Sequence, residues 1–278
     1  MFNTYSYTSE EIQERIQNIL NKGKQDFDQQ KAYRQILSFI DLTTLEGADT
    51  NEKAANLAKQ ACNYANAEMN IPNVAAVCVY PTLVKVVKEN LTDKNIGVAS
   101  VAGAFPAGMS PIEIKVAEVK YAVTEGADDI DMVLSRGKFL EGKLEEVQKE
   151  VKSIKEACGA AHLKVILETG ELKSVENIRK ASELSILGGG DFIKTSTGKI
   201  PVAATLEAML VMLDTIKEYY EKTGKKIGIK PAGGISEPEV AIDYYVLVKE
   251  ILGEDWLNNH LFRIGASRLA NKVFDLIK

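Results

Sequence analysis

The stretch DFIKTSTGK, from Asp191 to Lys199, places a lysine at the end of a short apolar run and follows it with hydroxyl side chains and a glycine. At the end of a buried strand, loss of hydration disfavours a charged ammonium, so Lys194 would be a neutral amine able to attack a carbonyl. The hydroxyl and backbone N–H groups of the following turn suit a phosphate or a sugar. An isolated lysine at a strand end is more often a surface residue, and the rest of the chain decides between these interpretations.

A short apolar run followed by a longer amphipathic stretch recurs eight times, and DFIKTS is the sixth of these runs. The others are ILSFID, which ends at Asp41, then VAAVCVY, NIGVASVAG, DDIDMVL, LKVILET, KIGIKPAGG and LFRIGAS. Strands that alternate with helices of ten or more residues need parallel crossovers, and eight such units in roughly 240 residues predict a closed (β/α)₈ barrel, the TIM barrel. A doubly wound open sheet is the alternative.

Both ends of the chain are predicted to be helical. Residues 9 to 36 carry apolar side chains at helical spacing, with Ser9 as a candidate cap and a polar break at residues 21 to 30. We therefore divide the chain into a helical N-terminal extension, 1–35, that packs on the barrel, and the barrel itself, 36–278. Other predicted helix limits are Thr50 or Asn51 to about Met69, Pro201 to about Tyr220, and an end of the last helix at Lys278.

The composition, with 45% hydrophobic and 26% charged residues among 278, is that of a globular protein with a sizeable core. A net charge of −5 argues against a surface for nucleic acid. No apolar stretch reaches the roughly 18 residues of a membrane span, and the N-terminus lacks a basic start followed by an apolar core. The three cysteines are widely spaced, so we expect reduced thiols, a cytoplasmic protein and no membrane partner.

Metal ligands are sparse in this sequence. His162 and His260 are the two histidines, and neither lies in a motif such as HExxH. We therefore expect no metal ion. Cys78 has no histidine beside it and is interpreted as a core residue.

Active sites of TIM barrels lie at the C-terminal ends of the strands, where this chain carries two aspartates and two lysines: Asp41, Asp131, Lys194 and Lys230. Side chains alternate along a strand, so the two lysines are predicted to face each other from successive strands. A second cation lowers the pKa of Lys194 further, because protonating both amines is unfavourable. Asp131, across the barrel, could neutralise one lysine and pass protons through water.

One layer deeper, the period of two places Asp129 and Lys164 on the inward faces of adjacent strands, where we expect them to pair as a support. Phe192 would lie below Lys194 and desolvate its amine. Gly228 would leave room beside the neighbouring lysine.

Three glycine-containing loops, TSTGK, PAGGIS and IGASR, follow the sixth, seventh and eighth runs. Their backbone N–H groups would lie where TIM barrels usually bind phosphate, after the last strands. Lys199 and Arg268 could add positive charge. A single glycine pair is more often only a turn, but three such loops converge here.

Taken in order, the motifs IDLTTLEGADT, VCVYP, GADDIDMVL, LKVILETGELK, DFIKTSTGK, KPAGG and GASR resemble those of the deoxyribose-phosphate aldolases, class I Schiff-base aldolases on a TIM barrel. The resemblance runs from about Ile36 to the C-terminus. It implies reversible cleavage of 2-deoxy-D-ribose 5-phosphate into D-glyceraldehyde 3-phosphate and acetaldehyde, in deoxyribose phosphate catabolism. It also implies that no metal and no organic cofactor takes part.

The resemblance implies a role for each matching residue. Lys194 matches the Schiff-base lysine. Asp131 and Lys230 match the proton-transfer pair, and Asp41 matches an aspartate that helps to hold the second lysine. Residues implied in substrate and phosphate binding are Thr195, which would line the sugar site, and Thr197, Gly198, Lys199, Gly233, Gly234, Ser236, Gly265, Ser267 and Arg268.

The chain departs from the family pattern in two loops. Ser236 stands where some members have an arginine, and Arg268 stands where many have a serine. The exchange either moves the phosphate's cation to the next loop or weakens the preference for a phosphorylated substrate. The N-terminal extension also lies outside the resemblance, and either barrel capping or a subunit contact would explain it.

Two rival functions stay open at the level of sequence. One is another Schiff-base barrel, such as a different sugar-phosphate aldolase or a pyridoxal-phosphate synthase. The other is a non-catalytic phosphosugar-binding protein, against which the intact set of Asp131, Lys194 and Lys230 argues. The oligomeric state is open too, with a dimer or a tetramer as the candidates.

Overall fold

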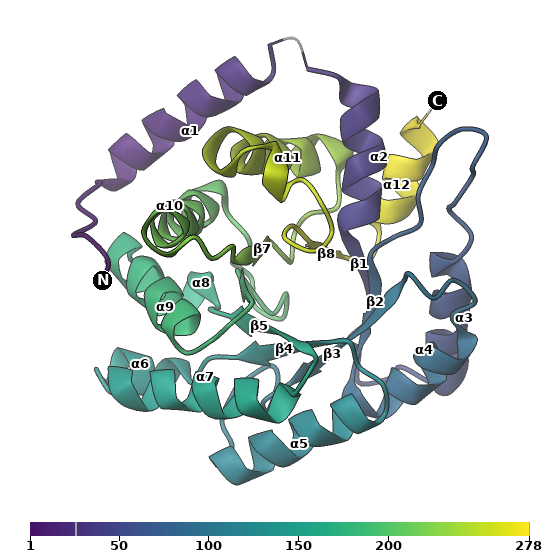
Figure 1. The fold of residues 1–278 in the computed structure, drawn as a ribbon, viewed down its shortest axis with the longest axis horizontal. Helices are drawn as coiled ribbons and strands as arrows, with labels where there is room; N and C mark the ends of the chain where they lie inside the picture. Colours follow the sequence, from purple (N-terminus) through teal and green to yellow (C-terminus); the bar gives the residue numbers. More distant parts are fainter. Residues whose placement is uncertain (26, 278) are drawn as a thin grey trace.

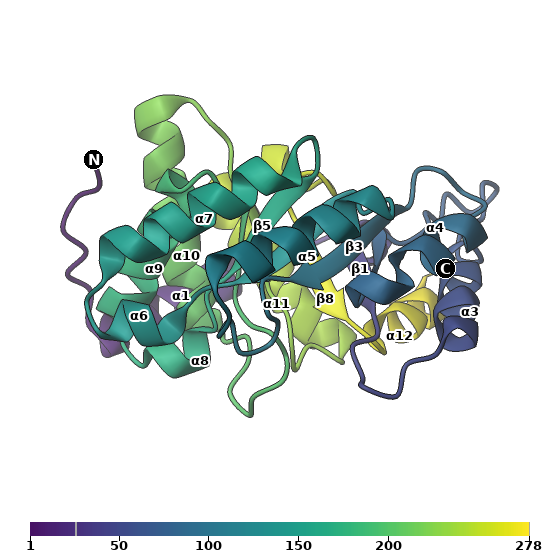
Figure 2. The ribbon, with the colours of Figure 1, turned by 90° about the horizontal axis from the view of Figure 1, so that it is seen from below.

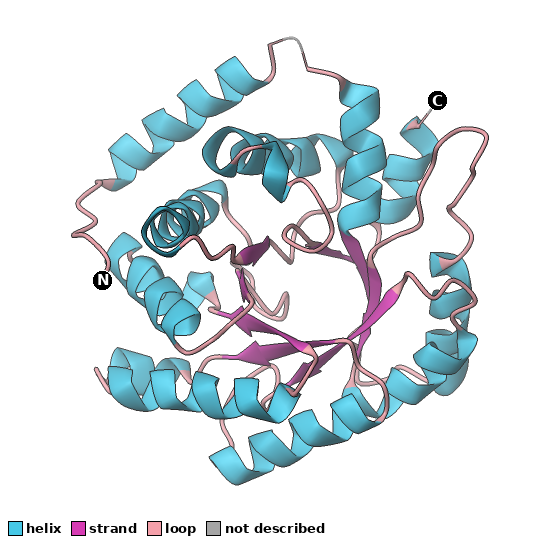
Figure 3. Ribbon diagram, viewed as in Figure 1, coloured by secondary structure: helices cyan, strands magenta, loops and turns pink. Residues whose placement is uncertain are grey.

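The computed structural model describes residues 1–25 and 27–277, and within them eight parallel strands form one sheet in the order β7-β6-β5-β4-β3-β2-β1-β8. Parallel bridges from Ile229 to Phe262 and from Ala232 to Gly265 join the two ends of this order, so the sheet curves into the barrel seen in Figure 3. The predicted (β/α)₈ fold is therefore confirmed. The strands are β1 (Ile40–Thr43), β2 (Ala76–Val79), β3 (Gly97–Ala102), β4 (Asp129–Val133), β5 (His162–Ile166), β6 (Phe192–Lys194), β7 (Gly228–Lys230) and β8 (Ile264–Ala266).

Helices connect the strands and surround the barrel (Figure 1). They are α3 (Asn51–Ala61), α4 (Val84–Asn90), α5 (Ile112–Thr124), α6 (Arg136–Leu140), α7 (Leu144–Cys158), α8 (Thr169–Leu172), α9 (Val175–Leu187), α10 (Leu206–Thr223), α11 (Pro238–Leu252) and α12 (Leu269–Leu276), with 3₁₀ turns at Pro81–Leu83 and Glu254–Trp256. Figure 2 shows α5 and α7 side by side across the outside of the strands. None of the helices in the described part of the chain is both long and apolar enough to cross a bilayer.

The first strand begins later than the run ILSFID predicts. Ile36 to Phe39 belong to α2 (Gln29–Phe39), which Asp28 caps by accepting a hydrogen bond from the Lys31 N–H. The first apolar residues of the run therefore form the buried face of a helix, at a spacing of three and four residues. The strand begins only at Ile40.

Two barrel helices also differ from their predicted limits. The helix after β1 ends at Ala61, well before Met69, and the helix after β6 begins at Leu206, where the Thr205 hydroxyl accepts from the Ala208 N–H, and not at Pro201. A hydroxyl cap thus defines this helix start better than the proline does. Lys278, where the last helix was predicted to end, lies outside the described residues.

The N-terminal helix α1 (Ser9–Gly23) lies outside α10 and α11 (Figure 1). Thr8, one residue before the predicted cap, closes a capping box with Glu11. The apolar face of α1 is buried, and Arg15 holds Asp214 of α10 through two hydrogen bonds of 2.7 and 3.0 Å. The second helix, α2, packs against α11 and α12.

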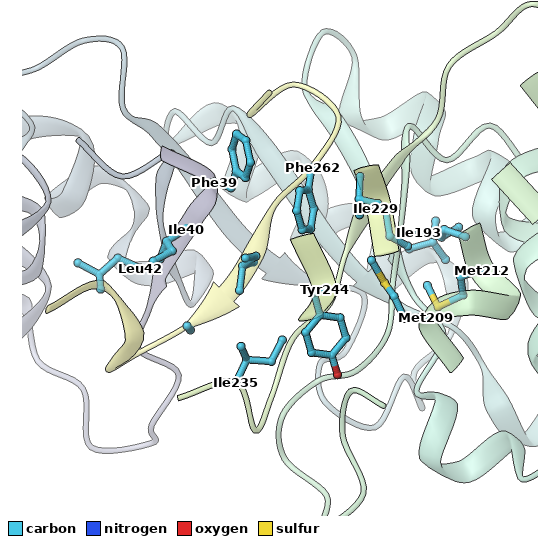
Figure 4. Packing of buried hydrophobic residues seen from close by; sticks show 14 of the residues in the cluster. Phe39, Ile40, Leu42, Ile193, Met209, Met212, Ile229, Ile235, Tyr244 and Phe262 are labelled. Carbon is cyan, nitrogen blue, oxygen red and sulfur yellow. The ribbon is translucent and has the colours of Figure 1, made fainter. Parts of the chain in front are cut away.

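The apolar core lies between the strands and the helices, as Figure 4 shows for the last strands. Ile193 of β6 and Ile229 of β7 point outward onto Met209 and Met212 of α10. Because side chains alternate along a strand, the residues on either side of Ile193 point into the barrel. One of them is Lys194.

Candidate active site

Two lysines lie side by side at the C-terminal ends of neighbouring strands. Lys194 of β6 pairs in register with Lys230 of β7, and both are buried, with 3% and 0% of their surfaces exposed. Across the barrel, Asp131 of β4 accepts a hydrogen bond from each lysine through one oxygen, Oδ2, at 2.7 Å. The three side chains predicted from strand ends therefore meet in one buried cluster.

Burial and charge act differently on the two lysines. Loss of hydration lowers the pKa of Lys194, and the Lys230 ammonium lowers it further, while Asp131 opposes both without cancelling them. The pKa of Lys230 is raised, because Asp131 and Asp41 together outweigh its burial. Lys194 is therefore the amine that is more easily neutral, and Lys230 remains a cation.

Asp41 of β1 lies where the sequence placed it, at the second lysine. Its Oδ2 accepts from Lys230 at 2.5 Å, and its Oδ1 accepts from Arg263 Nη1 at 2.7 Å. Arg263 was missed from the sequence, although it stands two residues before Gly265 and so on the same inward face. Burial would raise the pKa of Asp41, but the cations around it hold the pKa below its usual value.

The predicted pair of Asp129 and Lys164 is present in the layer below, with Nζ and Oδ2 2.7 Å apart. Gly228 does not have its expected role, which was to leave room beside the neighbouring lysine. Its space is filled by the ring of Phe192, since a Cβ there would lie 2.3 Å from ring atoms. The glycine that makes room for a lysine is Gly265, where a Cβ would approach Lys230 Cε to 3.2 Å.

A pocket of about 490 Å³ opens above Lys194. Its walls include the predicted residues Thr197, Gly198, Lys199, Gly233, Gly234, Ser236, Gly265, Ser267 and Arg268. Asp131 and Lys230 are not part of the wall and lie buried beneath it. Of the three charged groups that meet at Asp131 Oδ2, only Lys194 is thus presented to a ligand.

Thr195 does not line this pocket, contrary to the prediction. It is fully buried, and its hydroxyl exchanges hydrogen bonds with the backbone of Ala232, accepting from N–H at 3.0 Å and donating to C=O at 3.3 Å. It ties the turn after β6 to the turn after β7. Thr197 is similarly occupied, because both its N–H and its hydroxyl donate to the buried carboxylate of Glu168.

The end of β1, the loop after it and the first turn of α3 supply pocket residues that were not singled out from the sequence: Thr43, Thr44, Leu45, Glu46 and Lys53. Glu46 accepts from Lys199 at 2.9 Å, and Asp49 accepts from Lys53 at 2.5 Å. Arg268 is exposed and forms no ion pair within the described part of the chain. Lys53 and Lys199 thus have carboxylate partners in direct contact, whereas Arg268 acts on the Glu237 carboxylate only at longer range.

Two of the glycine loops touch each other at the pocket. Gly198, Gly233 and Gly234 have φ values of 75°, 81° and 80°, a region that favours glycine. A Cβ on Gly233 would lie 3.0 Å from the Cα of Gly198 and 2.6 Å from the Cβ of Ala203. These two loops therefore converge as predicted, and their contact depends on the absence of a side chain at Gly233. Among the described residues, no group of three or more His, Cys, Asp or Glu side chains is placed to hold a metal ion.

The profile of the DeoC/LacD family aldolases matches residues 35–243 of this chain. The chain belongs to the DeoC/LacD aldolase family. This agrees with the resemblance drawn from its motifs and makes the protein an enzyme of the aldolase class.

Proteins similar to this aldolase include two curated relatives and one solved structure that carry the name deoxyribose-phosphate aldolase. The deoxyribose-phosphate aldolases of Homo sapiens and Mus musculus are each 44% identical, over 250 and 249 residues, which cover 85% of this chain and 78% of theirs. The structure of the deoxyribose phosphate aldolase from Aeropyrum pernix, described as tetrameric, has a TM-score of 0.70 and 25% identity, and the match covers 93% of this chain and 96% of that one.

Proposed function

We propose that this aldolase cleaves 2-deoxy-D-ribose 5-phosphate reversibly into D-glyceraldehyde 3-phosphate and acetaldehyde, through a Schiff base on Lys194. One observation carries the proposal: of the two strand-end lysines, Lys194 alone lines the pocket, and its pKa is the one that is lowered. The names of the human and mouse relatives support the choice of substrate.

The reaction begins when the neutral amine of Lys194 attacks C1 of the open-chain sugar and water leaves, giving a protonated imine. The C3 hydroxyl loses its proton, the C2–C3 bond breaks, and its electrons move into the imine as an enamine. Glyceraldehyde 3-phosphate departs. Protonation of the enamine carbon and hydrolysis of the imine then release acetaldehyde and restore Lys194.

Asp131 and Lys230 would supply the protons for these steps. Asp131 Oδ2 contacts both lysines, while its Oδ1 has no hydrogen-bond partner among the described residues and so keeps accepting capacity. Because its pKa is held well below the usual value by Lys194, Lys230 and Lys164, against the effect of burial, Asp131 starts as a carboxylate. It would accept a proton from water or substrate and return it, with Lys230 as the neighbouring donor.

The phosphate would lie among the glycine loops. Gly198, Gly233 and Gly234 would offer backbone N–H groups there, together with Ser236 and Ser267. The N–H of Gly265 donates to the Pro231 C=O at 2.9 Å, so Gly265 would line the site without donating to the phosphate. Arg268 has no carboxylate within ion-pair distance among the described residues, so it would take the role that an arginine at position 236 has in some members of the family. Lys199 would join once it leaves Glu46.

We assign the enzyme to deoxyribose phosphate catabolism in the cytoplasm, with no organic cofactor. We propose a homo-oligomer, which the tetrameric relative from Aeropyrum pernix supports. We also propose that residues 1–35 form an extension to the barrel of residues 36–278.

Reductive trapping tests the proposed chemistry. Borohydride added with acetaldehyde or with deoxyribose 5-phosphate should convert the imine to a secondary amine, and peptide mass mapping should place the added mass on Lys194. Lys194→Arg should lose the label, because a guanidinium stays protonated. Labelling of Lys230 alone would reverse the two roles, and no substrate-dependent label at all would favour a non-catalytic phosphosugar-binding protein.

A further inference from the structure

Six buried side chains inside the barrel form a closed ring in which positive and negative charges alternate. The ring runs Lys230, Asp41, Arg263, Asp129, Lys164, Asp131 and back to Lys230, with successive N···O distances of 2.5, 2.7, 3.3, 2.7, 3.4 and 2.7 Å. The most exposed member is Arg263, at 8%. Each cation lies between two carboxylates, and each carboxylate lies between two cations.

This ring is neutral without Lys194. It holds three carboxylates and three cations, and Lys194 attaches to it from outside, through Asp131 Oδ2 at 2.7 Å. An uncompensated charge in a buried site is costly. A protonated Lys194 would be the fourth cation against three anions, so the electrostatics of the ring favour its neutral form.

We propose that Arg263 is a positioning residue that closes this ring and thereby keeps Lys194 a neutral nucleophile. The proposal rests on the function proposed above for Lys194. Arg263 occupies Asp41 Oδ1 and Asp129 Oδ2, which leaves Lys230 and Lys164 in contact with Asp131. Without Arg263, three carboxylates would share two ring cations, and Lys194 would complete the balance as an ammonium.

The titratable groups that face Lys194 do not change the charge balance of the ring. Facing it are Asp131 from β4, Lys230 from β7 and the thiol of Cys78 from β2. Burial raises the pKa of the Cys78 thiol, so it adds no charge at neutral pH. The mouth of the pocket adds Glu46, Lys53, Lys199 and Arg268.

One histidine touches the far side of the ring. His162 Nδ1 lies 3.2 Å from Asp129 Oδ1, and its side chain is half exposed. An imidazole ordinarily changes its charge between about pH 5 and 8. Each measurement below is therefore repeated in a His162→Gln background, which removes the imidazole beside Asp129.

The test measures how fast Lys194 forms an imine as the pH changes. Acetaldehyde is the probe, cyanoborohydride traps the imine, and the rate rises with pH as the reacting amine loses its proton. Arg263→Met should move the midpoint of this rise up by about one pH unit, so that trapping below the midpoint is roughly tenfold slower. The rate at high pH should recover, and Arg263→Lys, which keeps the charge, should move the midpoint much less.

A second variant removes charge of the opposite sign from the same ring. Asp129→Asn should move the midpoint down, because the ring then carries an excess positive charge. The double variant Arg263→Met with Asp129→Asn restores neutrality and should return the midpoint close to that of the unaltered protein. Should Arg263→Met not fold, as judged by circular dichroism and thermal melting, the downward shift in Asp129→Asn alone decides.

Two results would overturn the role of Arg263. One is a rate reduced by the same factor at every pH in Arg263→Met, which would indicate a general loss of structure. The other is a shift of the same sign in both single variants, which charge balance does not allow. A failure of the proposed function looks different, because Lys194 of the unaltered protein would then take no label at any pH.

Discussion

Lys194 and Lys230 hydrogen-bond to the same oxygen, since Asp131 Oδ2 lies 2.7 Å from the Nζ of each. A single carboxylate oxygen can compensate one ammonium better than two, and Lys230 has Asp41 as a further partner. The sharing therefore separates two chemically identical side chains into a cation and a nucleophile. It also gives a proton a short route between them through Asp131.

Replacing Lys230 with methionine tests this separation. With its neighbouring cation gone, Lys194 should have a higher pKa, and turnover at neutral pH should fall while the fold survives. The pH dependence of kcat/KM for deoxyribose 5-phosphate should move to higher pH, with a lower plateau because the proton donor is also lost. An unchanged profile in Lys230→Met would show that Lys230 does not activate Lys194 electrostatically.

Removing the unpaired guanidinium at the pocket should weaken binding of the phosphate. Arg268→Ala should raise the KM for deoxyribose 5-phosphate roughly tenfold, the lower end of the range for a charge-assisted contact, since Arg268 is exposed. The KM for unphosphorylated deoxyribose should stay the same, which makes that sugar the matched control. Equal effects on both sugars would place Arg268 outside the phosphate site.

Removing Glu46 should have the opposite effect, because its carboxylate holds Lys199 at 2.9 Å. Exposed ion pairs contribute little, so Glu46→Gln should lower the KM for deoxyribose 5-phosphate by roughly two- to fivefold. Glu52→Gln, which removes the same charge from an exposed position of α3, is the control. A KM that does not change, or that falls equally in the control, would mean that the phosphate does not compete with Glu46 for Lys199.

The N-terminal segment should contribute stability that depends on pH. Glu218 of α10 accepts from the Asn3 N–H at 2.6 Å and from Lys222 and Arg179, and these contacts outweigh burial and lower its pKa to about 2. A carboxyl group whose pKa is lowered in the folded state stabilises the fold at pH values above its pKa in the unfolded state. This contribution is lost as the pH falls toward 2.

Glu218→Gln should therefore reduce the free energy of unfolding at pH 7 by the order of 1–3 kcal/mol. In urea denaturation the gap between the two proteins should narrow as the pH falls from about 4.5 toward 2. Glu221→Gln, on the exposed side of the same helix, is the matched control and should lose little. A gap that does not depend on pH would assign the loss to packing and not to charge.

The period of two along the strands was enough to predict most of the cluster from sequence. It placed Asp131, Lys194 and Lys230 at one end of the barrel, and it paired Asp129 with Lys164 below them. The same rule reaches Arg263 from Gly265 within the run LFRIGAS, but arginine side chains are mostly exposed, so the residue type gave no reason to expect burial.

Contacts made by loops could not be predicted from the period of two along the strands. Thr195 has the right chemistry for a sugar, but the turn after β6 bends back, so its hydroxyl meets the Ala232 backbone. The pairing of Glu46 with Lys199 joins loops 153 positions apart in the chain, and no periodicity relates them. The predicted start of the first strand in ILSFID was wrong for a local reason, because the apolar residues of this run fit a helix and a strand equally well.

Because α1 lies across the outside of α10 and α11 (Figure 1), a second copy of the chain could reach the parts of those helices beneath α1 only by displacing it. That displacement would expose Ile12 and Ile16 and break the contact between Arg15 and Asp214. A symmetric assembly that leaves α1 in place would therefore use a surface other than this covered one, such as the outer face of α1 or the side of α5, where Ile114 and Tyr121 are exposed. The N-terminal helix thus restricts the quaternary structures open to this barrel, while none of its residues lines the pocket above Lys194.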